Sequence, residues 1–376
     1  MLRVLAAAAG LGCGDLAARL GLGNGGDPDS RIVWKYSEAA ESITPAIDDS
    51  TVFFATVTRG VRAVDKRSGA LRWAATSGRS GFSPGTALLV VGGVVVYPDA
   101  DLFAFDRRTG AVRWVFRDLP TGSPGYTSLA TDGVRVFAGS GSGDAFAIDP
   151  TDGHLVWKTR IATDSTQTVV ADPVVDAGLV VVTYSRPGGV ATGGICGLDA
   201  VTGAIRWRRE LTPAAAGQPS GGYRRAAVTS TLVVVSSADG RTFGLDRGTG
   251  SITWVTTRDA RLGAFQGDWR PVVVAGDVAV VGSSGFGTLA GLEVATGAER
   301  WQIDPKRGSF LDLMTVADGV IYLAFLPGEL AALDPQTGQL LWQTPSGTAN
   351  TYWTYPAVDA TRLFASGVAG LYALRR

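Results

Sequence analysis

Residues 332–343 read ALDPQTGQLLWQ, and nearly the same phrase occurs six more times in the chain. In this copy Asp334 is followed four residues later by Gly338 and eight residues later by Trp342. The other copies keep these offsets at Asp65/Gly69/Trp73, Asp106/Gly110/Trp114, Asp149/Gly153/Trp157, Asp199/Gly203/Trp207, Asp246/Gly250/Trp254 and, with glutamate for aspartate, Glu293/Gly297/Trp301. A phrase that returns at a nearly constant interval indicates a repeat architecture.

Each repeat unit contains four short apolar runs of strand length, separated by turn residues. In the last full unit the runs are 311–316, 320–325, 329–334 and 339–344. Pairs such as Asp318-Gly319 and Ala275-Gly276 are expected to close the first hairpin of a unit. The Asp and Gly of the phrase suit the last hairpin, because an aspartate can accept backbone N–H bonds within the turn and a glycine can take a positive φ.

The repeated tryptophan lies on the fourth predicted strand, four residues after the glycine. Its large ring can cover the seam to the next unit while its N–H donates to a backbone carbonyl. A single four-stranded sheet cannot bury two apolar faces, whereas sheets stacked around an axis can, which predicts a β-propeller. The predicted docking residues are Trp34, Trp73, Trp114, Trp157, Trp207, Trp254, Trp301 and Trp342.

The two ends of the repeat region complete one another. Residues 31–37, RIVWKYS, resemble a fourth strand without the preceding three, and residues 352–376 supply three strands without a fourth. Together with the seven complete phrases they predict an all-β, eight-bladed propeller over residues 31–376, closed by the N-terminal strand. Such closure removes the open edges of the sheets.

Composition and charge narrow the class of protein. The chain is 45% apolar and 18% charged, with a formal net charge of zero, which is typical of a globular protein. Nucleic acid is an unsuitable partner for such a chain, because phosphate binding requires a basic surface. The sequence contains no run of 18 apolar residues that could span a membrane as a helix.

The N-terminus, MLRVLAAAAGLGCGD, resembles a bacterial lipoprotein signal peptide. The resemblance implies a signal over residues 1–13, lipidation of Cys13, a flexible tether over 14–30 and a propeller anchored through one lipid. Gly10 stands where leucine is usual, and the apolar run is short, so a start without an export role stays an alternative. Cys196 is then expected to be a small buried hydrophobe on a strand.

The repeated phrase resembles the tryptophan-docking motif of the pyrroloquinoline-quinone (PQQ) repeat, found in eight-bladed propellers. It stands here as AVDKRSGALRW, AFDRRTGAVRW, AIDPTDGHLVW, GLDAVTGAIRW, GLDRGTGSITW, GLEVATGAERW and ALDPQTGQLLW. These matches cover about nine-tenths of the chain. The resemblance is specific for the fold and less so for function, because one fold hosts many functions.

Two branches share this repeat. Quinoprotein dehydrogenases hold PQQ with a calcium ion, glutamate and asparagine ligands, a catalytic aspartate and a vicinal Cys-Cys disulfide. This chain has no Cys-Cys pair, and its only asparagines are Asn24 and Asn350. The other branch comprises BamB-like lipoproteins, in which a propeller without a cofactor is a binding scaffold in outer-membrane β-barrel assembly.

One group of residues is a candidate binding site. Aligning the first strands places Thr44, Thr86, Tyr126, Asp172, Arg225, Arg270, Asp312 and Tyr355 at equivalent positions. If the first strands line the channel, these residues ring one of its mouths, and guanidinium groups beside aromatic rings suit carboxylates, planar groups or sugars. A hydrated channel whose charges satisfy one another is the alternative. The candidate binding residues are Tyr126, Asp172, Arg224, Arg225, Trp269, Arg270, Asp312, Trp353 and Tyr355.

Other chemistry finds little support in the sequence. The single histidine, His154, is expected to be a solvated surface residue, so neither a histidine-based triad nor a zinc site is predicted. The repeated aspartates are assigned to turns, and no catalytic residue is predicted. The insertions 184–194, 212–223 and 258–268 are either contact loops for a protein partner or plain connectors.

The sequence therefore predicts a monomeric, exported propeller that works as a non-enzymatic binding or scaffold protein. The specific role expected is BamB-like, with a protein partner and neither PQQ nor calcium. The expected location is the periplasmic face of the outer membrane, as a lipoprotein, with a periplasmic or extracellular location as the alternative. Two alternatives are a PQQ-dependent oxidoreductase and a propeller that senses a carbohydrate or another small ligand.

Overall fold

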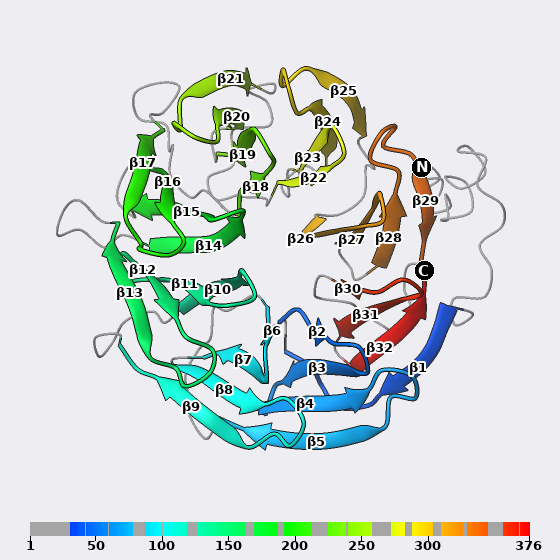
Figure 1. Cartoon of the computed structure of the whole chain (residues 1–376). Helices are drawn as coiled ribbons and strands as arrows, with labels where there is room; N and C mark the ends of the chain where they lie inside the picture. The colour runs from blue at the N-terminus through cyan, green and yellow to red at the C-terminus, as the bar shows by residue number, and fades with distance from the viewer. Residues whose placement is uncertain are drawn as a thin grey trace, which may run out of the picture.

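In a computed structural model the chain forms a ring of β-sheets around a central axis (Figure 1). The structure describes residues 31–41, 43–58, 60–77, 87–99, 101–118, 126–161, 169–186, 192–211, 225–237, 240–257, 272–282, 288–303, 310–325, 329–344, 356–367 and 369–376. Within these residues the elements are β-strands, and they form eight four-stranded antiparallel sheets. The predicted eight-bladed propeller is confirmed.

We number the blades along the chain. Blades 1 to 4 consist of β2 (Ala46–Ile47), β3 (Thr51–Thr56), β4 (Gly60–Asp65) and β5 (Leu71–Thr76); β6 (Leu89–Val91), β7 (Val94–Pro98), β8 (Leu102–Asp106) and β9 (Val112–Phe116); β10 (Tyr126–Thr131), β11 (Val136–Ser140), β12 (Asp144–Ile148) and β13 (Leu155–Arg160); and β14 (Val169–Asp176), β15 (Leu179–Arg186), β16 (Thr192–Asp199) and β17 (Ile205–Glu210).

Blades 5 to 8 complete the ring. They consist of β18 (Ala227–Val228), β19 (Leu232–Ser236), β20 (Arg241–Asp246) and β21 (Ile252–Thr257); β22 (Val273–Ala275), β23 (Val278–Gly282), β24 (Leu289–Glu293) and β25 (Glu299–Ile303); β26 (Phe310–Ala317), β27 (Val320–Phe325), β28 (Glu329–Leu333) and β29 (Leu340–Gln343); and β30 (Ala357–Val358), β31 (Arg362–Gly367), β32 (Gly370–Arg375) and β1 (Ile32–Tyr36).

In each blade the first strand lies next to the axis and the fourth lies on the circumference (Figure 1). Because the strands are antiparallel, the turns between first and second strands and those between third and fourth strands lie on the same face of the ring. We call this the turn face. The first strands begin on the opposite face, where the predicted channel mouth lies.

The N-terminal strand closes the ring, as the sequence predicts. β1 pairs antiparallel with β32, and Trp34 lies opposite Ala373. β1 therefore supplies the fourth strand of blade 8, whose other three strands come from the C-terminal end of the chain (Figure 1).

The core is a ring of separate clusters between the blades. Eight clusters of buried apolar residues occur, and each combines residues of two neighbouring blades. Phe116 of blade 2 and Phe146 of blade 3, for example, pack edge to face with 5.9 Å between ring centroids. Each blade therefore buries both of its faces only because it has two neighbours.

The motif tryptophans dock onto the next blade. Trp73 Nε1 donates to the carbonyl of Arg107, the residue after the motif aspartate of blade 2, at 3.0 Å. The equivalent bonds, 2.8–3.2 Å long, join Trp34 to Lys66, Trp114 to Pro150, Trp157 to Ala200, Trp207 to Arg247, Trp254 to Val294 and Trp301 to Pro335.

The motif glycines meet two demands at once. Gly250 has a φ of +68°, and a Cβ there would lie 2.5 Å from Cε3 of Trp207. A side chain at this position would therefore strain the backbone and also collide with the docked ring. At each of the six other motif glycines an added Cβ would likewise lie 2.4–2.7 Å from the nearest atom of a tryptophan ring.

The eighth seam is built differently. No turn joins β32 to β1, so Trp342 of blade 7 has no motif turn to dock onto. Instead the guanidinium of Arg31 lies over its ring, 4.3 Å from the centroid. Arg31 Nη1 also donates to the carbonyl of Arg376 at 3.3 Å. Arg31 thus covers the face of Trp342 that a glycine turn covers in the other seams.

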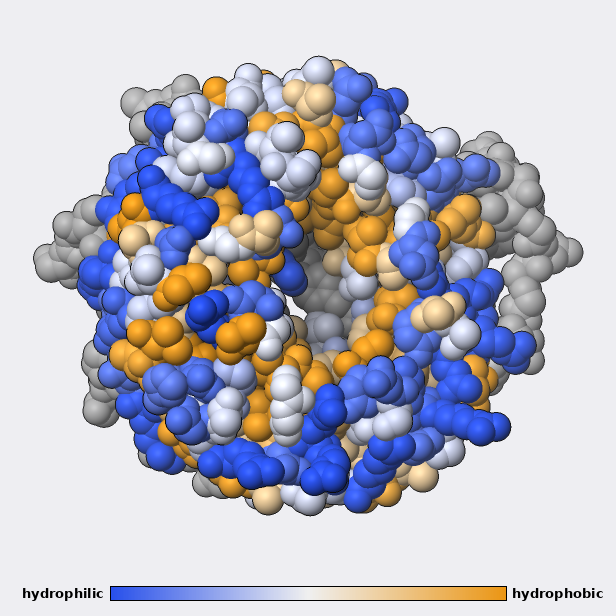
Figure 2. Space-filling view, in the orientation of Figure 1, coloured by the Kyte–Doolittle hydropathy of each residue, from blue (hydrophilic) through white to orange (hydrophobic). Residues whose placement is uncertain are grey.

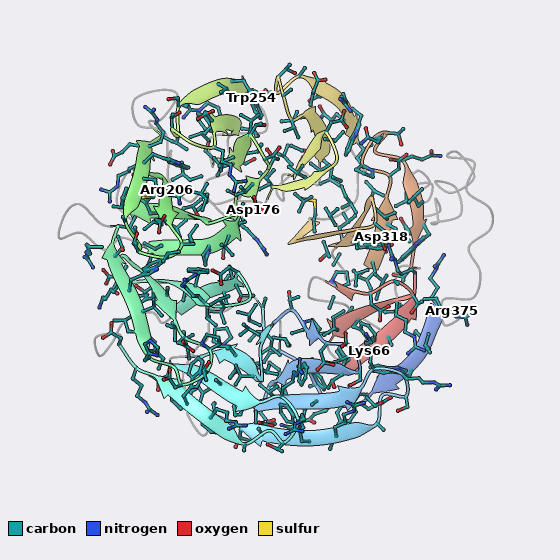
Figure 3. All side chains as sticks on the ribbon, viewed as in Figure 1. Lys66, Asp176, Arg206, Trp254, Asp318 and Arg375 are labelled. Atoms are coloured by element: carbon teal, nitrogen blue, oxygen red, sulfur yellow. The ribbon has the colours of Figure 1, made fainter. Side chains whose placement is uncertain are left out.

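Ion pairs on the turn face join several neighbouring blades. In each, an aspartate in the first hairpin turn of one blade meets a cationic side chain just after the third strand of the next blade. The pairs are Asp48 with Arg107 at 3.5 Å, Asp359 with Lys66 at 3.3 Å, Asp318 with Arg376 at 2.5 Å, and Asp176 with Arg247 (Lys66, Asp176 and Asp318 are labelled in Figure 3).

The motif aspartates accept hydrogen bonds from the backbone amides of their own turns. Asp106 Oδ1 accepts the amides of Arg108 and Thr109, while Oδ2 accepts Arg113 Nη2 at 2.6 Å. Arg113 and the turn donors hold the pKa of Asp106 well below its usual range, and Arg72 does the same for the pKa of Asp65. These contacts assign the repeated aspartates to the turns, as the sequence predicts.

The double role of the motif glycine can be tested with Gly250→Ala and Gly319→Ala. Gly319 has a φ of +73°, but a Cβ at this position would meet no heavy atom within 4 Å. We expect Gly319→Ala to cost about 1 kcal/mol of unfolding free energy from the left-handed backbone alone. Gly250→Ala should cost an additional ~1–3 kcal/mol because the tryptophan must move. Urea denaturation measures both, and equal losses would contradict the docking contact.

The motif aspartates also predict an acid-sensitive stability. The folded pKa values of Asp65 and Asp106 lie below the unfolded value of about 3.9, so these two carboxylates stabilise the fold above that pH and lose this contribution as the pH falls through it. The double variant Arg72→Gln/Arg113→Gln should therefore lose less unfolding free energy between pH 5 and pH 3 than the parent protein. Urea denaturation at each pH measures the difference.

The matched control is Arg67→Gln/Arg108→Gln. These exposed arginines lie in the same two turns, and among the described residues their side chains have no ion-pair partner. Its pH dependence should equal that of the parent. If unfolding free energy changed with pH equally in both double variants, Arg72 and Arg113 would not be what lowers the pKa values of the motif aspartates that they contact.

Candidate functional site

The candidate site is the mouth of the central channel, on the face opposite to the turn face. The first strands of all eight blades surround the axis (Figure 1), and a hollow lies at the centre of the ring in the space-filling view (Figure 2). The prediction that first strands line the channel is therefore correct.

The structure describes part of the predicted ring of mouth residues. Tyr126 is the first residue of β10, Asp172 lies within β14, Arg225 lies two residues before β18, and Asp312 lies within β26. All four thus belong to innermost strands or their entrances. The remaining candidates, which lie outside the described residues, are Arg224, Trp269, Arg270, Trp353 and Tyr355.

Asp172 is the most constrained residue of this group. Its side chain is buried, its φ is +44°, and Pro173 follows it. A non-glycine residue in this conformation stores backbone strain of about 1–3 kcal/mol. The pairing of β14 with β15 shifts register between Ala171 and Val174, so Asp172 lies in a β-bulge.

A hydrogen bond between blades holds the Asp172 carboxylate. Ser128 Oγ, on β10 of blade 3, donates to Asp172 Oδ1 on blade 4 at 2.5 Å. The sequence did not predict a role for Ser128. The one feature of the sequence that could have indicated this role is spacing, because Ser128 lies 44 residues before Asp172, which is about one blade repeat.

Arg225 differs from Asp172 in being exposed. Among the described residues its guanidinium has no hydrogen-bond or ion-pair partner, and its carbonyl accepts the amide of Val272 at 3.2 Å. A backbone bond of the same kind links Leu88 N to Thr44 O at 3.1 Å. At these two seams a backbone bond ties one blade to the next, and within the described part of the chain the Arg225 guanidinium is left unpaired.

The structure describes one of the two cysteines for which the sequence makes a prediction. Cys196 on β16 is fully buried, and its Sγ donates to the carbonyl of Trp207 at 3.4 Å. Burial raises the pKa of this thiol to about 11, so it is the small buried residue that the sequence predicts. Cys13, the predicted lipidation site, lies outside the described residues.

His154 lies on the surface, in the motif turn of blade 3. Its Nδ1 is 2.7 Å from Asp152 Oδ1, and both side chains are more than half exposed. Asp149 completes a group of three residues with metal-ligand chemistry whose ligand atoms lie within 4.8 Å of one another. The motif turn itself brings these exposed groups together.

One predicted insertion is shorter than expected. Residues 184–186 extend β15 and residues 192–194 begin β16, and Tyr184 pairs with Gly194. Interpreting 184–194 as one loop was wrong, because its Gly-rich end forms a strand ladder. Gly194 lets the two strands pack closely, since a Cβ at this position would lie 2.7 Å from Tyr184 Oη. Residues 212–223 and 258–268 lie outside the described residues, as do 187–191.

The described part of the chain offers no membrane-spanning helix. No helix there has the length and apolar character that crossing a bilayer would require.

Comparisons of the sequence point to one family. The family model described as "Outer membrane protein assembly factor BamB" matches residues 26–192 and 191–375. A relative of that name from Yersinia pestis is 25% identical over 251 residues, which cover 62% of this chain and 59% of the relative. Another from Vibrio cholerae is 27% identical over 152 residues, covering 37% of each protein. The matched regions thus span less than two thirds of these relatives' length.

Comparisons of the structure show the fold. BamB from Moraxella catarrhalis superposes with a TM-score of 0.70 at 21% identity, covering 91% of this chain and 98% of that protein. A europium-containing methanol dehydrogenase gives 0.73 at 14% identity, covering 92% and 93%. Both proteins thus share the fold of this chain, and the fold alone does not assign a function. The family model covers both halves of the ring: the chain belongs to the family of the outer membrane protein assembly factor BamB.

Proposed function

We propose that this protein is a non-enzymatic scaffold that binds a protein partner in outer-membrane protein assembly. The observation that carries the proposal is the family match over residues 26–192 and 191–375, which together include all eight blades. The curated relatives from Yersinia pestis and Vibrio cholerae are named as assembly factors, which supports the same role here.

The proposal includes export and a lipid anchor. The run MLRVLAAAAGLGC ends in the cysteine that such a signal would lipidate, and Cys13 precedes the first described strand, which begins at Ile32, by only a short stretch of chain. A tether of that length would keep the propeller close to a membrane surface without embedding it. The protein would then act at the periplasmic face of the outer membrane.

The absence of catalysis is part of the proposal. An activity like that of the quinoprotein dehydrogenases would require a Cys-Cys pair and asparagine ligands for calcium. The sequence instead contains two separated cysteines, and its two asparagines are Asn24 and Asn350. We expect neither PQQ nor calcium to bind. A purified protein that retains a quinone and oxidises an alcohol would overturn the scaffold proposal.

We assign the partner's contact to the channel mouth. Arg225 presents a guanidinium there that is exposed and has no partner among the described residues. Asp172 stores backbone strain at the same mouth, and strain of this kind concentrates at binding sites. A charged side chain on a rigid rim suits recognition of a complementary protein surface.

A small acidic or carbohydrate ligand at the same mouth is the second candidate, favoured by the exposed guanidinium of Arg225. Arg225→Ala combined with Arg270→Ala, tested by calorimetry against a panel of dicarboxylates and sugars, separates the two candidates. Binding that the double variant abolishes would support this second function.

The scaffold proposal predicts a charge-sensitive partner. After cross-linking in the native membrane, affinity purification should recover outer-membrane assembly proteins together with an acylated Cys13 peptide. Arg225→Glu should reduce that recovery at least about tenfold, because it reverses the exposed charge. Quantitative mass spectrometry measures both.

Arg67→Glu is the matched control, since Arg67 is also exposed but lies on the turn face. Recovery should be unchanged in this variant. Equal recovery with Arg225→Glu and the parent protein would refute the channel mouth as the contact, and failure to recover any assembly protein from the parent would refute the scaffold role.

A further inference from the structure

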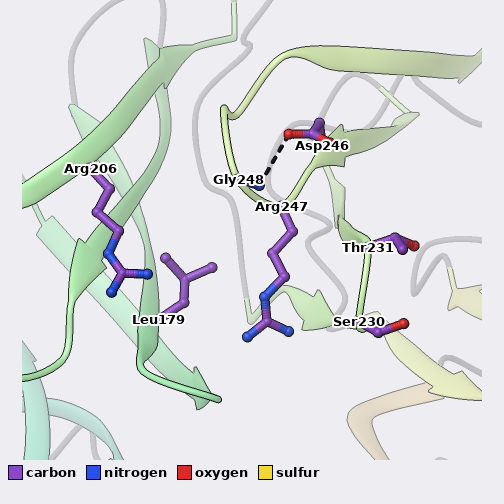
Figure 4. A pocket seen from close by; sticks show the side chains of 7 residues that line it. All are labelled: Leu179, Arg206, Ser230, Thr231, Asp246, Arg247 and Gly248. Carbon is purple, nitrogen blue, oxygen red and sulfur yellow. Dashed lines mark hydrogen bonds between the residues drawn. The ribbon is translucent and has the colours of Figure 1, made fainter.

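A pocket of about 380 Å³ opens between blades 4 and 5 on the turn face (Figure 4). It is therefore on the opposite side of the ring from the channel mouth. Pockets of this size accommodate a small ligand or a few side chains of a polypeptide. The residues that line it are Leu179, Arg206, Ser230, Thr231, Asp246, Arg247 and Gly248.

Arg206 supplies one wall with hydrogen-bond donors. Its Nη2 donates to Asp199 Oδ2 at 2.6 Å, which fixes the guanidinium in its own hairpin. Its other nitrogens have no partner among the described residues, and its side chain is 44% exposed. Ser230 and Thr231, both exposed, line the pocket from the turn between β18 and β19.

Arg247 forms a second, immobile cationic wall. Its Nη1 donates to Thr229 O and its Nη2 to Asp176 O, both at 2.6 Å, and its Nη1 also pairs with the Asp176 carboxylate. These bonds join blade 5 to the first hairpin turn of blade 4. Arg247 therefore shapes the pocket and contributes charge without needing to move.

One oxygen of the acidic residue in the lining is held by donors of its own turn. Asp246 Oδ1 accepts the amide of Gly248 at 3.1 Å (dashed in Figure 4) and the amide and hydroxyl of Thr249 at 2.8 Å. These three donors compensate that oxygen, and the unused donors of the lining are those of Arg206. Such a set matches a carboxylate.

Gly248 explains why the hollow exists at this seam. It is the second residue after the motif aspartate, where the other blades carry Arg67, Arg108, Thr151, Val201, Ala295 and Gln336. Gly248 does not have a positive φ, and a Cβ would meet only Asp246 Oδ1, at 3.5 Å. The turn therefore does not require glycine at this position, and the missing side chain leaves the space open.

We propose that this pocket binds the carboxylate of an acidic side chain in an extended polypeptide segment. Val201 and Ile205, in the same hairpin as Arg206, are 58% and 41% exposed, and Leu179 adds an apolar wall. Apolar surface beside a guanidinium suits a side chain that carries both methylene groups and a carboxylate. This second binding site goes beyond the assembly role and does not depend on it.

Binding can be measured by fluorescence anisotropy of a labelled tetraglutamate peptide at low salt, with a tetraglutamine peptide as its neutral counterpart. We expect the glutamate peptide to bind at least about fivefold more tightly than the glutamine peptide. Arg206→Gln should weaken it by at least about the same factor, because it removes the free donors. Gly248→Gln should do the same by filling the hollow, and the turn tolerates that side chain because Gln336 has the equivalent place in blade 7.

Arg113→Gln is the matched control. Arg113 makes the same contact with its motif aspartate, Nη2 to Asp106 Oδ2 at 2.6 Å, so this variant measures the effect of losing that contact alone. Unchanged binding in Arg113→Gln with loss in the two pocket variants is the expected result. Equal binding by all variants, equal loss in Arg113→Gln, or displacement of the peptide by succinate at equal carboxylate concentration would overturn the proposal.

Discussion

The propeller depends on one contact between neighbouring blades. In this contact a tryptophan ring packs against the glycine of a turn in the next blade, and its Nε1 donates to a carbonyl of that turn. The contact is specific because it has two components. The glycine must be a glycine both for its positive φ and for the ring that lies against it, as at Gly250 and Trp207. The carbonyl fixes the rotation of the ring, as Arg247 O does for Trp207 at 2.9 Å. Since each blade shares its buried faces with two neighbours, this contact sets the spacing at which those faces meet.

The closing seam shows what the contact contributes. Trp342 keeps its position in the motif but finds no glycine turn on blade 8, whose fourth strand comes from the other end of the chain. Arg31 covers the ring instead and bonds to the carbonyl of Arg376. An arginine side chain can supply planar cover and donors, but it is more mobile than a turn. The pairing of β1 with β32 places Arg31, which directly precedes β1, beside the seam between blades 7 and 8.

The sequence predicted those features that one repeat unit determines by itself. Strand order, motif turns and blade count follow from spacing within a single blade repeat, and the split final blade followed from counting strands at the two ends. Side-chain contacts between blades that lie outside the repeated motif were not predictable. Ser128 and Asp172 lie 44 residues apart, and no local pattern marks Ser128 as a partner. The extension of β15 and β16 into residues 184–194 was missed because glycines suggested a loop, whereas they allow close packing against Tyr184.

Departures from the repeat carry different meanings at different positions. At the acidic position of the motif a departure such as Glu293 keeps the acceptor and hence the turn, because Thr296 Oγ1 still donates to it at 2.7 Å. At the position of Gly248 the turn places no demand on the side chain, so variation there cannot be explained by folding. A residue that the fold leaves free is available to binding, and in a ring of near-identical seams it can make one seam chemically distinct. Function in this protein is therefore best sought where the repeat is free to vary, at the channel mouth on one face and at the seam between blades 4 and 5 on the other.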